Sequence, residues 1–122
     1  MRPGRHIADY LNDMLEAALE AEGFLRDVDF DDFASNVEKI RAVTKSLEIV
    51  GEAAKHVPES MRERYPGVPW RDIAGMRDSL AHGYFSVDLA RVWDTVRKDL
   101  PSLRDHLDLI LAELSGEGAD GG

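Results

Sequence analysis

Four side chains that could act together chemically lie between positions 77 and 84: Arg77, Asp78, His82 and Tyr84. An imidazole titrates near neutral pH and can serve as a general acid or base, whereas a guanidinium stays charged and binds two phosphate oxygens in one plane. Asp78 lies four residues before His82, so on a helix its carboxylate could orient the imidazole. This combination suits phosphodiester chemistry, because negative charge that grows on phosphate oxygens needs a fixed cation.

Helical geometry limits how Arg77 and His82 can share one site. They are five positions apart in the sequence, which places them about 140° apart around a regular helix. A joint site therefore needs the helix to end near Gly83, a typical C-terminal stop, or a second copy of the chain. Each residue also has a purely structural interpretation: His82 as a helix cap, Arg77 in a surface ion pair, and Tyr84 in the core. On the residues alone, these structural roles are the more common ones.

The spacing Arg77, four residues, His82, one residue, Tyr84 resembles the Arg-x4-His-x-Tyr motif of HEPN-domain ribonucleases. In particular it resembles the HepT-like toxins, which pair with a minimal nucleotidyltransferase antitoxin. The polar Asp78 after the motif arginine also fits. The resemblance covers roughly residues 7 to 114, and its other matching segments are residues 47–54, 68–77 and 87–101.

The resemblance implies an endoribonuclease whose composite active site lies at a homodimer interface. Arg77 and His82 would be catalytic, with Asp78 assisting His82, and neither a metal ion nor a cofactor is expected. Because the nucleophile would be the RNA's own 2'-oxygen, the expected product is a 2',3'-cyclic phosphate. The motif tyrosine of HepT-like toxins receives AMP from the partner enzyme. Tyr84 would then be the adenylylation site that silences the toxin of a type VII-like toxin–antitoxin system.

Two other functions stay open. The chain could be a non-catalytic HEPN subunit that binds a nucleotidyltransferase and contributes to nucleotide or substrate binding. It could also be a plain dimeric scaffold, in which case Arg77→Ala and His82→Ala would change nothing but stability. The intact set of Arg77, His82 and Tyr84 favours the enzyme.

Composition limits the class of protein. The chain has 122 residues, is 43% hydrophobic and contains no cysteine, which favours one domain without disulfides or thiolate metal sites. No signal peptide or long apolar run is apparent, so we expect a cytoplasmic protein without a membrane partner.

The net charge of -9 disfavours RNA binding at first sight. Residues 1 to 60 hold 7 basic and 13 acidic side chains, but residues 61 to 105 hold 8 and 7. We therefore consider an RNA groove lined by Arg71, Arg77 and Arg91. Ordinary solvated helix charge is the simpler interpretation of the charge pattern alone.

Apolar residues at helical spacing predict an all-α, up-and-down bundle of four to five helices. The expected boundaries place residues 1–114 in the helical domain, followed by a flexible, Gly-rich acidic tail at residues 115–122. The expected helices cover residues 5–22, residues 31–56, a short segment within 58–69, a motif helix opened by Pro69, a helix capped by Ser86, and a last helix started or kinked by Pro101.

Three further features have simple structural interpretations. The aspartates between Asp27 and Asp32 lack the glycine and bidentate glutamate of a calcium loop and suit a helix N-terminus. Glu48 and Glu52 share a helix face but have no partnering histidine at the spacing of a metal site, so we expect solvated or cap-bonding roles. Gly51 is expected to allow a neighbouring helix to pack closely.

Overall fold

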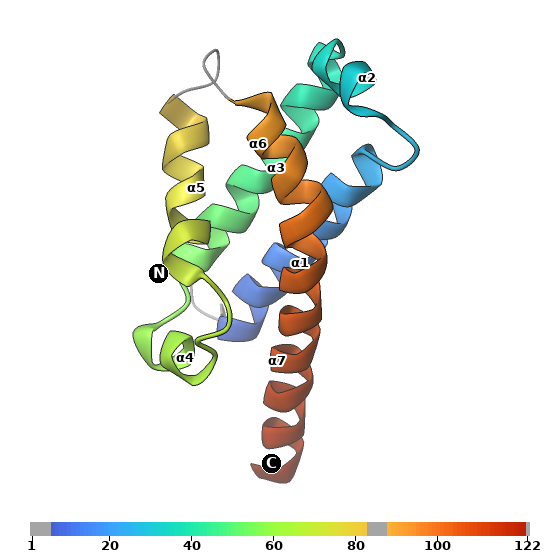
Figure 1. Cartoon of the computed structure of the whole chain (residues 1–122). Helices are drawn as coiled ribbons and strands as arrows, with labels where there is room; N and C mark the ends of the chain where they lie inside the picture. The colour runs from blue at the N-terminus through green and yellow to red at the C-terminus, as the bar shows by residue number, and fades with distance from the viewer. Residues whose placement is uncertain (1–5, 83–87, 122) are drawn as a thin grey trace.

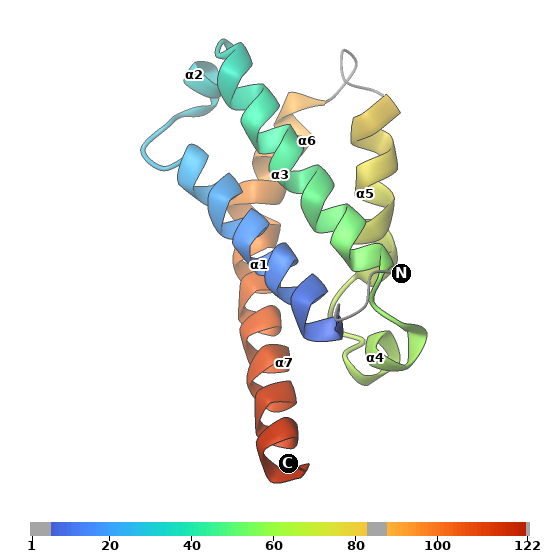
Figure 2. The same ribbon diagram turned by 180° about the vertical axis from the view of Figure 1, so that it is seen from behind.

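The chain folds into packed helices, as the computed structural model shows (Figures 1 and 2). The structure describes the backbone of residues 6–82 and 88–121, and the side chains of residues 6–76 and 88–116. Within these ranges there is no strand, which confirms the all-α prediction. The elements are α1 (Ile7–Phe24), α2 (Phe30–Ala34), α3 (Val37–Lys55), α4 (Glu59–Arg64), α5 (Trp70–His82), α6 (Leu89–Asp94), the π-helical turn η2 (Thr95–Asp99) and α7 (Leu100–Gly121).

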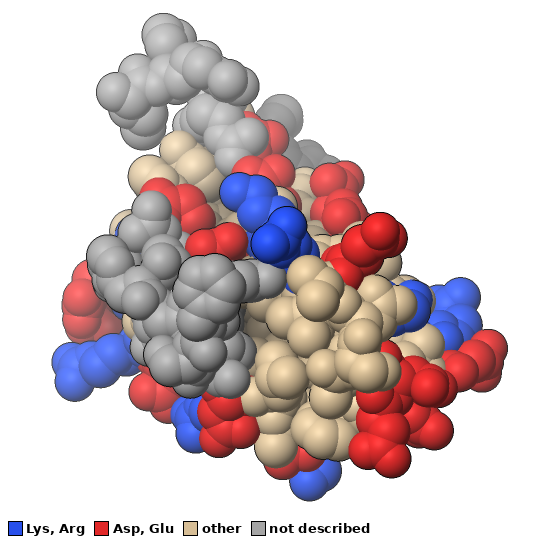
Figure 3. Space-filling model, turned by 90° about the horizontal axis from the view of Figure 1, so that it is seen from above, with Lys and Arg blue, Asp and Glu red and all other residues tan. Residues whose placement is uncertain are grey.

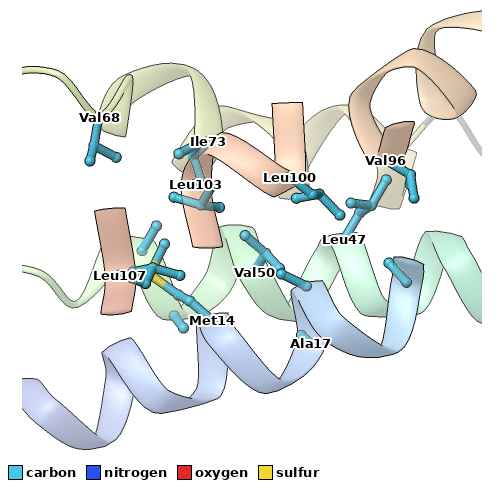
Figure 4. Close-up of a cluster of buried hydrophobic side chains, with 14 of the residues drawn as sticks. Met14, Ala17, Leu47, Val50, Val68, Ile73, Val96, Leu100, Leu103 and Leu107 are labelled. Carbon is cyan, nitrogen blue, oxygen red and sulfur yellow. The ribbon is translucent and has the colours of Figure 1, made fainter. Parts of the chain in front are cut away.

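The core lies between α1, α3, α5 and the rod formed by α6, η2 and α7 (Figure 4). Met14 of α1, Val50 of α3 and Leu107 of α7 are completely buried. Gly51 is buried too, in agreement with close helix packing at that position. At the edge of the core, Arg104 Nη2 donates to Glu22 Oε1 at 3.2 Å, tying α7 to α1. This hydrogen bond raises the pKa of Arg104.

The first helix ends later than the sequence indicated. Gly23 was expected to end it, but α1 continues to Phe24. The residue with left-handed backbone in the following turn is Asp27, with φ at 59°. Asp is one of the few residues other than glycine that adopt this conformation readily, so the chain turns without using Gly23.

The predicted helix over residues 31–56 is wrong in one respect, because it is broken at Ser35 and Asn36. The Ser35 hydroxyl donates to the carbonyl oxygen of Asp31 at 2.9 Å, at the end of α2. The side-chain oxygen of Asn36 then accepts from the Lys39 amide at 3.0 Å and starts α3. Asp29 caps α2 in the same way, accepting from the Asp32 amide at 2.8 Å. These local hydrogen bonds compete with a continuous helix.

The short helix expected before the motif is present as α4, which follows Pro58. It is fastened to the end of α3 by Arg62, whose Nη2 donates to the Ala54 carbonyl oxygen at 2.8 Å and whose Nε donates to that of Val57 at 3.0 Å. The terminal carbonyls of α3 thereby gain partners that the helix itself cannot supply.

The last two predicted helices form one continuous rod. Asp88 caps α6 by accepting from the Arg91 amide at 3.2 Å. The expected cap, Ser86, lies outside the described residues. The turn before Pro101 is π-helical, and the Leu100 amide donates to the carbonyl of Thr95. Proline has no amide hydrogen and its ring crowds the carbonyl four residues back, so a wider turn relieves the conflict.

The C-terminal boundary also differs from expectation, because the backbone of α7 continues past Leu114 to Gly121. The flexibility of residues 115–122 stays a prediction. No helix in the described ranges is both long and apolar enough to cross a bilayer.

Candidate active site

The predicted motif lies on the second half of α5. Arg77, Asp78 and His82 belong to this helix, whereas their side chains and all of Tyr84 lie outside what the structure describes. The first half of α5 is firmly packed. Trp70 is 5% exposed, and its indole nitrogen donates to the Tyr65 carbonyl oxygen at 3.0 Å. The helix that carries the motif is therefore held at its start by a buried, hydrogen-bonded anchor.

Arg77 and His82 both belong to α5, and the helix ends at His82, next to the predicted stop at Gly83. Because α5 includes both Arg77 and His82, the two Cα positions lie about 140° apart around one helix. His82 follows Gly75 by seven residues, so their Cα positions lie within about 20° of each other. Gly75 lines a large groove beside α5. The backbone thus places the His82 position about 20° from Gly75 and the Arg77 position about 40° from Ile73, and both Gly75 and Ile73 line the groove.

This groove has a volume of about 820 Å³ and lies between α5 and the α6–η2–α7 rod, with α3 beneath. Its apolar members include Val50, Ile73, Val92 and Leu103, all buried or nearly so. Its polar members come from the start of α5 and from one face of the rod: Arg71, Asp72, Asp88, Arg91, Thr95, Lys98, Asp99, Ser102 and His106.

Arg71 and Arg91, both proposed from the sequence as groove arginines, line this groove together. Both are exposed, and neither guanidinium forms an ion pair with any part of the chain that the structure describes. Lys98 also lines the groove but lies 3.5 Å from Asp94, in a highly exposed pair that contributes little binding energy. In a chain with 24 acidic and 15 basic residues, two arginines without acidic partners are available for an external anion.

The surface seen from above carries Lys and Arg side chains near its centre, and both basic and acidic side chains around its margin (Figure 3). Asp72, Asp88 and Asp99 also line the groove, so its charge is mixed. One Asp88 oxygen is engaged as the cap of α6.

Comparison with known proteins shows which family this sequence matches. The family model described as Ribonuclease HepT-like matches residues 14–110. The chain belongs to the HepT-like ribonuclease family. This confirms the family and the enzyme class expected from the motif.

Curated relatives of this HepT-like chain span nearly its whole length. It is 45% identical to the probable ribonuclease HepT of Thermococcus cleftensis over 100 residues, covering 82% of this chain and 91% of the relative. Two Methanocaldococcus jannaschii proteins, both named as candidate RNases, are 38% and 36% identical, covering 92% and 94% of this chain and 97% and 95% of theirs. No solved structure gives a significant match.

The acidic pairs noted in the sequence do not join the groove of this HepT-like chain. Glu52 lies 3.9 Å from the His56 Nε2 on the exposed end of α3. Asp29, in the acidic cluster, caps α2. Within the described ranges, no three His, Asp or Glu side chains gather in a way that could hold a metal ion.

Sequence reasoning missed the part of the groove contributed by the HepT-like chain's C-terminal rod, above all Lys98, Asp99 and His106. A signal was present, because polar residues recur at positions 88, 95, 99, 102 and 106, the three- and four-residue spacing of one helix face. That repeat indicates a polar face, but its position opposite α5 depends on the packing of the bundle.

Proposed function

We propose that this HepT-like chain is a metal-independent endoribonuclease toxin that cleaves RNA through attack of the 2'-hydroxyl on the adjacent phosphorus. The observation that carries the proposal is the family motif, Arg77-x4-His82-x-Tyr84, whose Arg77 and His82 belong to α5, beside a groove lined by Arg71 and Arg91. In this mechanism the bond from phosphorus to the 5'-oxygen breaks and the two products are a 2',3'-cyclic phosphate and a 5'-hydroxyl.

The roles follow from side-chain chemistry. His82 takes the proton of the 2'-hydroxyl or delivers a proton to the leaving 5'-oxygen, because only imidazole exchanges protons readily near neutral pH. Arg77 binds the non-bridging oxygens, where charge grows in the transition state. Asp78, one helical turn before His82, accepts from the imidazole and fixes its tautomer. Arg71 and Arg91 bind flanking phosphates in the groove.

The active site is proposed to be composite. Because the Arg77 and His82 positions lie on different sides of α5, we assign Arg77 of one protomer and His82 of its partner to the same phosphate. A symmetric homodimer would then hold two such sites.

Regulation is proposed to act through Tyr84. A partner nucleotidyltransferase would join the Tyr84 phenol oxygen to the α-phosphorus of ATP, with pyrophosphate leaving. The attached AMP carries negative charge and bulk two residues from His82, where the RNA phosphate must bind. Adenylylation therefore acts as the off switch of the toxin.

Cleavage of a labelled single-stranded RNA in excess EDTA tests the proposed activity. We expect unmodified protein to release cyclic-phosphate ends, and His82→Ala to lose at least about 100-fold in rate, as for the loss of a general acid or base. His56→Ala, on the far end of α3, is the matched histidine control and should retain activity. If unmodified protein of confirmed mass leaves the RNA intact, the chain is a non-catalytic subunit.

A further inference from the structure

His106 lies in the groove with its imidazole already oriented. Its Nδ1 is 2.9 Å from the carbonyl oxygen of Ser102, one helical turn earlier on α7. A carbonyl oxygen can only accept, so in the neutral ring Nδ1 carries the hydrogen and Nε2 is an acceptor. Nε2 has no hydrogen-bond partner within the described residues. The ring therefore offers a positioned acceptor that the fold itself does not use.

The loop before α5 makes room for this ring. A Cβ atom at Gly67 would lie 3.2 Å from His106 Nε2, closer than ordinary van der Waals contact. The absence of a side chain at Gly67 thus lets the backbone of the loop approach the imidazole. His106 is half-buried, and both residues line the groove.

The position of His106 defines a far end of the groove. The α6–η2–α7 rod runs antiparallel to α5, so Asp88 and Arg91 lie towards the His82 end and His106 lies beside the start of α5 (Figure 1). The 13 residues of α5 span about 20 Å at about 1.5 Å per residue. At about 3.4 Å per stacked nucleotide, this is a length of about six nucleotides, or fewer if the strand is extended.

The hydrogen-bond acceptors at the His106 end of the groove favour a nucleobase over a phosphate. The Nε2 acceptor and the carboxylates of Asp72 and Asp99, which also line the groove, would repel phosphate oxygens. They would accept from N–H groups, which the edges of unpaired nucleobases present. Arg71, near the start of α5, and Arg91, towards the His82 end, provide cations for the phosphates of the strand.

We propose that His106 forms a remote subsite that binds a nucleobase of single-stranded RNA several nucleotides from the cleaved bond, with Nε2 accepting a base N–H. This subsite would make cleavage depend on a base away from the reacting phosphate. The inference rests on the proposed ribonuclease function, from which it takes the identity of the occupant.

Binding of short single-stranded RNAs to the non-cleaving His82→Ala protein tests the subsite. One abasic nucleotide is introduced at each position in turn, and affinity is measured by fluorescence anisotropy. We expect one position several nucleotides from the cleaved bond to lose about tenfold in affinity when abasic, as for a lost base contact. After His106→Ala, the abasic change at that position should have less than about a twofold effect, because the contact is already gone.

Three further variants separate a base contact from other effects. His106→Gln keeps an acceptor near the Nε2 position and should retain most of the sensitivity. Arg71→Ala should weaken binding of intact and abasic RNA equally, as a phosphate contact does. Leu109→Ala, an exposed α7 residue outside the groove, is the control and should behave as the parent.

The subsite proposal is contradicted if the abasic nucleotide still lowers affinity after His106→Ala. It is also contradicted if an abasic nucleotide affects binding only at the cleaved bond. It is also wrong if His106→Ala shifts the molecular mass in solution while RNA affinity is unchanged, since the groove would then be a protein interface. Cleavage by the unmodified parent is a separate measurement. The cleavage measurement therefore tests the proposed ribonuclease activity independently of the subsite.

Discussion

At the scale of single residues, Arg71 and Arg91 are cations that have no acidic partner among the residues that the structure describes, in a strongly acidic chain. A surface arginine in such a chain usually has carboxylates within reach, yet these two line one groove without an ion pair in the described structure. Leaving them unpaired keeps their five donors available for an anion such as an RNA phosphate. The same groove contains His106, whose free Nε2 adds an acceptor to these donors.

Tyr84→Phe is the residue change that separates activity from regulation. The phenyl ring keeps the shape of the tyrosine but has no oxygen to receive AMP, so ribonuclease activity should stay within about twofold of the parent while silencing is lost. Co-expression with the partner nucleotidyltransferase, followed by intact mass and cleavage assays, measures both. Tyr65→Phe serves as the matched control and should be adenylylated and silenced like the parent. A Tyr84→Phe protein that is still modified and silent would exclude Tyr84 as the site.

The sequence was informative where the role of a residue depends on its neighbours along the chain. The family motif predicted the enzyme class, which the family match confirms. Arg71 and Arg91, considered for an RNA groove, line one groove in the structure, and their RNA-binding role stays a prediction. The roles of Arg77, Asp78, His82 and Tyr84 stay predictions. His106 was missed because its meaning depends on Gly67, which is distant in sequence and contacts it only in the folded chain.

At the scale of elements, the helices followed from apolar periodicity, but their ends did not. The break between α2 and α3 depends on two side-chain hydrogen bonds, from Ser35 and to Asn36, inside a pattern that periodicity alone would continue. Pro101 was correctly expected to start or kink the last helix, because α7 begins at Leu100, but the π turn that joins α7 to α6 was not predicted. Periodicity reports which face is buried, whereas capping and backbone strain decide where each helix starts.

Asn36→Ala tests the cap at the start of α3. Without the side-chain acceptor the Lys39 amide loses its partner, and we expect the free energy of unfolding to fall by about 1 kcal/mol. Urea denaturation at fixed protein concentration measures this change. Asn36→Asp retains the acceptor and should stay close to the parent. Equal stability of Asn36→Ala and the parent would mean that the cap does not stabilise the folded state.

At the scale of the whole molecule, the helical bundle carries both the groove and the motif helix α5. The helical register of α5 places the two proposed catalytic positions, Arg77 and His82, about 140° apart. Helical geometry allowed this conflict to be stated from the sequence, and α5, which ends at His82, leaves both solutions in place: a helix that ends near Gly83 and a second copy of the chain. In the proposed homodimer, one copy of the chain supplies the arginine and the other supplies the histidine. The assembly itself could not be derived from one chain, since it depends on a second surface.

Mixing two inactive variants tests the central claim most directly. Arg77→Ala and His82→Ala proteins are each expected to be inactive, but dimers exchanged between them contain one site with both residues intact. Random exchange makes half of the dimers mixed, each with one of two sites working, so about one quarter of parental RNA cleavage should return. The measurement is cleavage of labelled RNA after subunit exchange, with each variant alone as the control. A mixture that stays as inactive as its components, although mass spectrometry detects mixed dimers, would contradict a ribonuclease site shared between two copies of this chain.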